Sequence, residues 1–217
     1  MVPSLPPAGS PRHAGVMSSL FTWRGIDDPD RLDHAVLTLA HDRLSGHGVS
    51  LTPSYASSWQ LDVGAGWVTR SLHVSVQGRG WGRSLALIHD GDGGWMADAS
   101  GWGDTALEPP GLQEPESLRG AIDCDLALCP VTNTMPIRRL GFLEHAVPDT
   151  TLVMAWVEMP SLRVLRSDQV YATGPAEAGR SVRYANSGGD FQADLMVDDD
   201  GIVVDYPHLA RRVRVED

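Results

Sequence analysis

The sequence predicts an all-β, mainly antiparallel domain, folded as a strongly curved sheet or an incomplete β-barrel with few short helices. Three observations predict this class. Short segments alternate between apolar and polar residues, 23 glycines and 15 prolines interrupt them, and an Asp- and Gly-rich turn occurs once in each half of the chain. Evenly spaced short segments bounded by turn residues are typical of antiparallel sheets.

The clearest strands are residues 71–77 (SLHVSVQ) and 191–197 (FQADLMV), in which apolar side chains occupy every second position. Successive strand residues point to opposite faces, so each segment has one apolar face. Residues 124–128, 151–159 and 201–206 have a similar composition and are expected to be further strands.

Two segments need separate treatment. Residues 29–44 (PDRLDHAVLTLAHDRL) fit a helix through Leu32, Val36, Leu39 and Leu44, but they also contain the strand-like AVLTLA. Periodicity alone does not separate these alternatives. Residues 103–117 are rich in proline and are expected to form a connector near the middle of the chain.

The connector separates two similar halves, at about 20–108 and 118–217, of a single β domain. Asp90 and Gly93 in the first half match Asp198 and Gly201 in the second, which indicates an internal duplication. Hairpin turns select Asp and Gly anyway, so convergence is the alternative. Residues 1–19 contain several prolines and few apolar residues, and we expect a disordered leader, with Met1 or Met17 as the start.

Composition excludes several classes of protein. The formal net charge is -11 at pH 7, which repels phosphate backbones, so nucleic acid is not an expected partner. No apolar run approaches the roughly 20 residues of a transmembrane helix, so the chain is not expected to span a membrane. The oligomeric state has no signature in the sequence.

The two cysteines are expected to be reduced. Cys124 and Cys129 are five positions apart. On a strand this separation spans about 16 Å and places the thiols on opposite faces, too far apart for a disulfide. Free thiols suit a cytoplasmic location.

The sequence contains no established metal-binding or catalytic motif. The Asp-rich turns lack the closing glutamate of a calcium loop, and the eight histidines form no zinc-binding spacing. The motifs GxSxG, GxGxxG and GxxxxGK[ST] do not occur. We therefore expect no cofactor and no metal, and we name no catalytic residue.

The most unusual segment is 129–142 (CPVTNTMPIRRLGF), which places Arg138 and Arg139 within an apolar run. On a strand these two side chains would point to opposite faces, so one would face the interior and need a partner. Glu158 is the expected protein partner, and Asn133 is expected to share a ligand. The arginine is then either part of a structural ion pair or an anchor for the polar headgroup of a ligand.

Four stretches resemble a known family. They are DLALCPVTNTMPIRRLG (125–141), AWVEMPSLRV (155–164), the pair Gln169 and Tyr171, and FQADLMVDDDGIVVDYPHLARR (191–212). They resemble the bacterial family labelled putative glycolipid-binding proteins, over roughly Leu20 to Val215. The resemblance implies a β-rich fold akin to lipoprotein carriers, whose curved sheet covers an apolar cavity. It implies no catalytic residues.

We therefore expect the protein to bind an amphiphile, such as a glycolipid or a fatty acyl compound, in a concave apolar cavity. The candidate ligand-binding residues are Asn133, Arg138, Arg139, Trp156, Glu158 and Tyr206. Two alternatives stay open. One is an enzyme of unrecognised class that acts on a small molecule in the same cavity, and the other is a protein-interaction module. A pocket that holds carboxylates with a perturbed pKa would favour the enzyme, and a filled interior would favour the interaction module.

Overall fold

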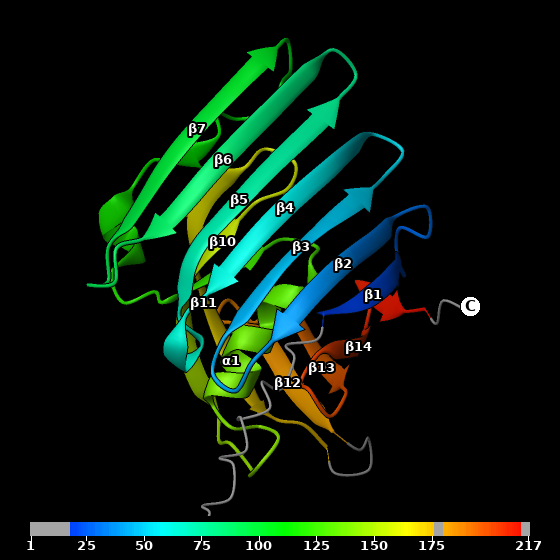
Figure 1. Cartoon of the computed structure of the whole chain (residues 1–217), viewed down its shortest axis with the longest axis vertical. Helices are drawn as coiled ribbons and strands as arrows, with labels where there is room; N and C mark the ends of the chain where they lie inside the picture. The colour runs from blue at the N-terminus through cyan, green and yellow to red at the C-terminus, as the bar shows by residue number, and fades with distance from the viewer. Residues whose placement is uncertain (1–17, 176–179, 214–217) are drawn as a thin grey trace, which may run out of the picture.

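The computed structural model describes residues 18–175 and 180–213. Their strands form one open, strongly curved sheet of 15 strands (Figure 1). The order along the main path is β7-β6-β5-β4-β3-β2-β1-β15-β14-β13-β12-β11-β10-β9. The predicted fold class is confirmed, and of its two forms the open curved sheet is the one observed.

The first half of the chain forms an antiparallel meander in which each strand pairs with the next. Its strands are β1 (Ser18–Gly25), β2 (Leu32–Leu39), β3 (Leu44–Leu51), β4 (Tyr55–Val63), β5 (Thr69–Gly78), β6 (Trp81–His89) and β7 (Trp95–Gly103). A short 3-10 helix, η1 (Ala65–Trp67), joins β4 to β5. The last two residues of the expected leader therefore belong to β1, and residues 1–17 lie outside the described part of the chain.

The ambiguous segment 29–44 contributes β2 and no helix. Asp33, Ala35 and Leu37 are its buried positions, and they follow a period of two. The helix interpretation required Leu32, Val36 and Leu39 to share a face. Pairing of β2 with both β1 and β3 instead satisfies the backbone along the whole segment.

The second half completes the sheet. It contains β9 (Asp123–Leu126), β10 (Thr150–Val157), β11 (Arg163–Thr173), β12 (Ser181–Asn186), β13 (Gln192–Val197), β14 (Val203–Tyr206) and β15 (Ala210–Arg212). The halves meet where β1 pairs with β15. The sheet is mixed because β9 pairs parallel with β10, and β8 (Gly111–Leu112), a strand inside the expected connector, pairs parallel with β11.

Short helices follow the connector and β9. They are η2 (Pro115–Leu118), η3 (Pro130–Asn133) and the α-helix α1 (Thr134–Arg139). In Figure 1, α1 lies behind the β2–β5 part of the sheet and in front of β11 and β12, so that the sheet curves around it.

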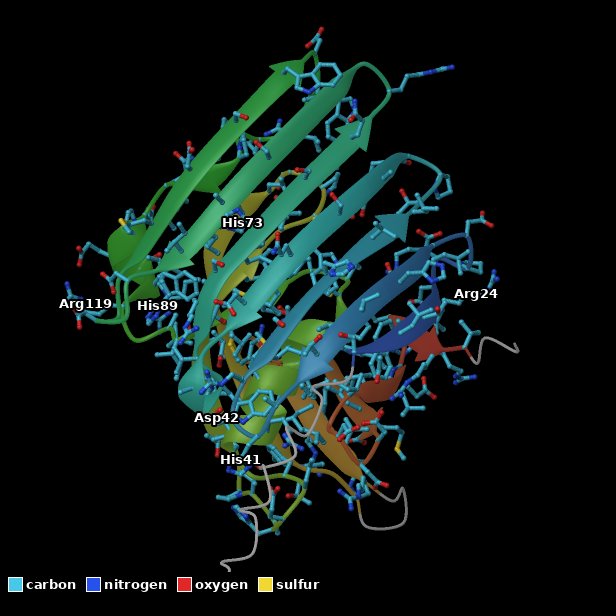
Figure 2. All side chains as sticks on the ribbon, viewed as in Figure 1. Arg24, His41, Asp42, His73, His89 and Arg119 are labelled. Carbon is cyan, nitrogen blue, oxygen red and sulfur yellow. The ribbon has the colours of Figure 1, made fainter. Side chains whose placement is uncertain are left out.

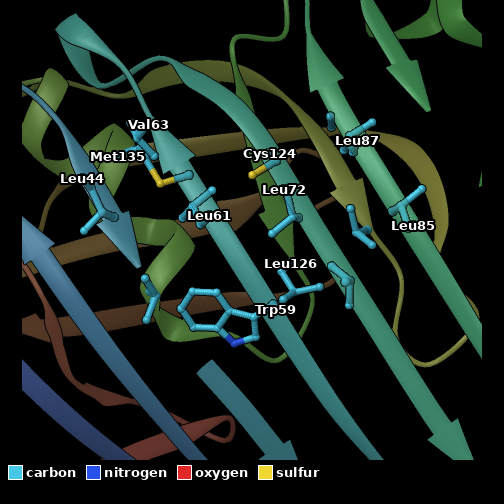
Figure 3. Close-up of a cluster of buried hydrophobic side chains, with 14 of the residues drawn as sticks. Leu44, Trp59, Leu61, Val63, Leu72, Leu85, Leu87, Cys124, Leu126 and Met135 are labelled. Atoms are coloured by element: carbon cyan, nitrogen blue, oxygen red, sulfur yellow. The ribbon is translucent and has the colours of Figure 1, made fainter. Parts of the chain in front are cut away.

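The concave side of the sheet is filled with side chains. The inner faces of β3 to β6 pack against β9 and α1, with Leu61 and Leu72 near Cys124, Leu126 and Met135 (Figure 3). A second cluster joins α1 to β10–β14 through Ile137, Met154, Tyr171, Leu195 and Val203. Burial of apolar surface contributes about 25 cal/mol per Å² to stability, and it is the main force that packs the curved sheet against α1.

The two Asp-Gly turns have the same local structure. The Asp90 carboxylate accepts hydrogen bonds from the backbone N–H groups of Asp92 and Gly94, at 2.8 and 2.9 Å. Asp198 accepts from Asp200 and Ile202 at 3.0 and 2.9 Å. One turn joins β6 to β7 and the other joins β13 to β14. Superposition of the two halves remains a prediction.

Within residues 18–175 and 180–213, no helix is long and apolar enough to cross a membrane. The same residues contain no group of three or more His, Cys, Asp or Glu side chains that could hold a metal ion.

Candidate functional site

The segment around Arg138 and Arg139 is helical, and the prediction that it is a strand is wrong. Pro130 begins η3, and Pro136 lies in the first turn of α1, where its missing N–H needs no partner. The two arginines occupy the last turn of the helix. On this helix the two side chains do not point to opposite faces as they would on a strand.

Arg139 does reach a buried carboxylate, but that carboxylate belongs to Asp123 on β9. Its Nη1 donates to Asp123 Oδ1 at 2.7 Å, and its Nη2 donates to Oδ2. Burial raises the pKa of Asp123, and the guanidinium of Arg139 opposes that rise. Glu158 is not the partner, because it accepts a hydrogen bond from the Ser161 hydroxyl. The expectation of a Glu158–arginine pair is therefore wrong.

Arg138 has a different neighbour. Its guanidinium carbon lies 5.0 Å from the centre of the Trp67 ring, which is a cation–π contact. A Cβ atom on Gly201 would lie 3.2 Å from the Arg138 Cδ. Both arginines therefore pack α1 against neighbouring elements, and their contact with a ligand stays a prediction.

The other three candidates, Asn133, Trp156 and Tyr206, line one pocket of about 470 Å³. We call it the Asp125 pocket. It is lined by Asp125, Leu126, Ala127, Leu128, Cys129, Asn133, Trp156, Leu165, Arg166, Ser167, Tyr184, Asn186, Phe191, Tyr206 and Leu209. Its volume lies within the range of small-molecule sites, about 300–1,000 Å³.

Four aromatic residues form part of the pocket lining. Trp156 comes from β10, Tyr184 from β12 and Tyr206 from β14, and Phe191 immediately precedes β13. The rings of Tyr184, Phe191 and Tyr206 pack against one another with centres 5.9 to 6.2 Å apart. Burial raises the pKa of both tyrosines, so their hydroxyl groups stay protonated at neutral pH.

A polar network links Asp125 to the elements beneath it. One carboxylate oxygen accepts from the Thr132 hydroxyl at 2.8 Å, and the other accepts from Gln169 Nε2 at 2.7 Å. The Tyr171 hydroxyl lies 3.2 Å from Gln169 Oε1 and 3.0 Å from Asn133 Oδ1. Burial raises the pKa of Asp125, and the bonds from Gln169 and Thr132 oppose that rise.

Cys129 also lines the pocket and is a free thiol. Burial raises its pKa to about 12, so at neutral pH it is neither a thiolate nor a nucleophile. Burial likewise raises the pKa of Cys124, which packs in the core.

Other hollows are less suited to a small ligand. One between β1–β4 and residues 126–131 offers only about 20 Å³, room for about one water. Hollows of about 560 and 500 Å³ lie over the face of β3–β7 that is turned away from α1, and serines line both of them. His73, which lines the larger hollow, lies on β5 (Figure 2). The Asp125 pocket combines a volume of about 470 Å³ with four aromatic lining residues and, as one of its lining residues, a carboxylate held by buried hydrogen bonds.

Sequence reasoning did not identify Asp125, Gln169, Tyr171 or Tyr184 as site residues. Asp125 is the first residue of the TNTMPIRRLG-containing stretch, and Gln169 and Tyr171 form the Q-x-Y pair. Hydrogen bonds join these two stretches in the folded protein, from Gln169 to Asp125 and from Tyr171 to Gln169.

The fold and pocket define an open, curved β-sheet protein with a pocket between its second-half strands and the segment after β9. The chain belongs to the family described as "Putative glycolipid-binding", whose model matches residues 20–212. A crystal structure of a DUF1089 family protein from Pseudomonas aeruginosa is 27% identical and has a TM-score of 0.63. The similarity covers 83% of this chain and 92% of that one. No curated protein matches the sequence.

Proposed function

We propose that the protein binds the polar headgroup of an amphiphile, such as a glycolipid, in the Asp125 pocket. The observation that carries this proposal is a pocket of about 470 Å³ with four aromatic residues around a buried polar network. Small-molecule sites combine apolar and aromatic walls with a few convergent polar groups. Membership of the "Putative glycolipid-binding" family supports the same class of ligand.

The pocket lining suits a sugar. The carbon–hydrogen faces of a sugar ring can pack on Trp156, Tyr184 or Tyr206, and its hydroxyls can reach Asp125 and Asn133. Leucines 126, 128, 165 and 209 also line the pocket and can contact the first carbons of an attached alkyl chain. Core side chains fill most of the concave side of the sheet. We therefore place the ligand in this pocket, two of whose walls, Tyr184 and Tyr206, belong to the second core cluster, and not in one large apolar cavity.

Calorimetric titration with octyl β-D-glucoside, kept below its micelle concentration, tests the proposal. We expect saturable binding, with weaker binding of octan-1-ol because it lacks the sugar. Trp156→Ala should weaken glucoside binding about tenfold or more, since it removes a large aromatic wall. Trp102→Ala is the matched control, because Trp102 is 56% exposed on β7. Equal binding to both variants, or none to the wild type, would reject the proposal.

An enzyme is the second candidate, and one observation favours it. Asp125 is a carboxylate with a raised pKa in a pocket, which is a feature of general acids. Most glycoside hydrolases need a second carboxylate, and the neighbouring Asp123 is engaged by Arg139. Mass spectrometry of octyl β-D-glucoside incubated with the protein separates the two functions. Intact glucoside is expected from binding, and released glucose would establish hydrolysis.

A further inference from the structure

The Asp125 carboxylate has unused acceptor capacity. An ionised carboxylate offers about four acceptor positions. Among the described residues, the hydrogen-bond donors that reach it are the Thr132 hydroxyl and Gln169 Nε2, one on each oxygen. Each oxygen therefore keeps a free acceptor position, and the residue lines the pocket.

Asp125 also lacks a counter-ion among the residues that the structure describes. Within the described part of the chain, no arginine or histidine forms an ion pair with it. Arg139 binds the neighbouring Asp123 through two hydrogen bonds. A partly buried carboxylate with only neutral donors is poorly compensated, because burial penalises the charged form.

The cationic side chain that lines the pocket is already engaged. Arg166 donates to Asp168 from Nε at 2.9 Å and from Nη2 at 2.6 Å. Because the Arg166–Asp168 pair has no net charge, it attracts an anionic ligand less than a free arginine would. The chain as a whole carries a formal charge of -11, which repels anions and attracts cations.

Aromatic rings complete the environment. Trp156, Tyr184, Phe191 and Tyr206 line the same pocket as the carboxylate. Aromatic faces attract cations through their ring quadrupoles, and tryptophan is the strongest of them. A carboxylate that has no counter-ion among the described residues and shares its pocket with aromatic rings is suited to a protonated amine.

We propose that the Asp125 pocket selects amphiphiles whose headgroup carries a protonated amine, such as an amino sugar, with Asp125 as the counter-ion. This inference rests on the proposed function and names the class of headgroup. It also implies selection against phosphate and other anionic headgroups, which would face Asp125 without a partner.

Three ligands that differ at one position test the inference. They are octyl β-D-glucoside, octyl 2-amino-2-deoxy-β-D-glucoside and its N-acetyl derivative, titrated by calorimetry at pH 6 and below their micelle concentrations. Since a charge-assisted hydrogen bond is stronger than a neutral one, the amine should bind about 10- to 100-fold more tightly than either neutral ligand. Octyl phosphate should bind more weakly than all three.

Two variants locate the effect. Asp125→Asn should remove the preference for the amine, so that the amine and the neutral glucoside bind the variant with equal affinity. Asp98→Asn is the matched control, because it removes one carboxylate from the exposed surface of β7 and should keep the preference. If Asp125→Asn does not fold, the ligand series on the wild-type protein still decides the question.

The outcomes separate the two proposals. Equal binding of the three sugars would overturn the inference and leave the proposed function intact. Absence of binding by every sugar would overturn both. An amine preference that persists in folded Asp125→Asn would overturn Asp125 as the counter-ion.

Discussion

Asp123 and Asp125 lie two residues apart on β9, so their side chains leave the same face of the strand. Burial raises the pKa of both. Their partners differ. Asp123 is 1% exposed and accepts hydrogen bonds from both terminal nitrogens of Arg139. Asp125 accepts one hydrogen bond from the Thr132 hydroxyl and one from the Gln169 amide, and it lines a pocket.

This difference shows that two aspartates on one face of a strand can have different charge environments. The charge of Asp123 is matched within the protein, and its pair with Arg139 attaches α1 to β9. The charge of Asp125 is not matched among the described residues. A buried charge without a partner lowers stability, and such a cost is tolerated at sites that interact with something else.

Removal of the Arg139 guanidinium should have the largest effect. Arg139→Met keeps most of the side-chain volume but leaves the Asp123 carboxylate buried without a cation. We expect the free energy of unfolding to fall by about 3–5 kcal/mol at pH 7, as measured by urea denaturation.

Arg211→Met is the control for this variant. Arg211 pairs with Asp205 at 2.9 Å, but its side chain is 66% exposed. An exposed ion pair contributes about 0–1 kcal/mol. Equal losses in the two variants would show that the Arg139–Asp123 pair has no special role.

Substitution of the two aspartates compares them directly. Asp123→Asn should lower the free energy of unfolding by about 1.5–3 kcal/mol, because it replaces charge-assisted hydrogen bonds with weaker ones. Asp125→Asn should change it by less than about 1 kcal/mol, since loss of an unmatched charge offsets any weakened hydrogen bond. If Asp125→Asn lowered the free energy of unfolding more than Asp123→Asn does, the charge of Asp125 would not be the unmatched one.

The sequence predicts the sheet better than the site, and the reason is periodicity. A period of two is a local property, so it identifies strands such as 71–77 and 191–197 directly. The segment 29–44 was undecided because its local pattern fits both periods. Its neighbours β1 and β3 decide it, and that pairing is not local.

The helix α1 is harder to predict, because its local sequence pattern indicates the wrong structure. Its six residues include a proline and lie in an apolar run, so they read as extended chain. Of the six candidate ligand-binding residues, Asn133, Trp156 and Tyr206 line one pocket. The expected partner, Glu158, lies at the end of an apolar segment, but the sequence does not reveal that α1 contacts β9, which carries Asp123.

The raised pKa of Asp125 also predicts how the stability of the protein depends on pH. Because the folded-state pKa of Asp125 lies above its unfolded value of about 3.9, this group favours folding at low pH. That contribution is lost as the pH rises through the folded-state pKa. The free energy of unfolding of Asp125→Asn, relative to wild type, should therefore increase between pH 4 and pH 7.

The charged and titratable neighbours of Asp125 allow this test to be interpreted. They are the Asp123–Arg139 pair, the Arg166–Asp168 pair, Cys129, Tyr171, Tyr184 and Tyr206. The thiol and the phenols have raised pKa values and stay neutral in this range. Urea denaturation at several pH values measures the difference, and parallel curves for the two proteins would contradict a raised pKa of Asp125.

The smallest expected effect concerns two threonines that are adjacent to Asn133 on either side. The Thr132 hydroxyl donates to Asp125, whereas the buried Thr134 hydroxyl has no partner among the described residues. Thr132→Val should lower the free energy of unfolding by about 1 kcal/mol at pH 7, because it removes one of two donors from a charged acceptor. Thr134→Val should leave stability unchanged or raise it, since it removes an unsatisfied buried hydroxyl. Losses of equal size in urea denaturation would show that valine is simply tolerated poorly in this segment and that the bond to Asp125 contributes nothing. The loss in Thr132→Val should also shrink at pH values below the raised folded-state pKa of Asp125, because protonation of Asp125 weakens the bond that the valine removes.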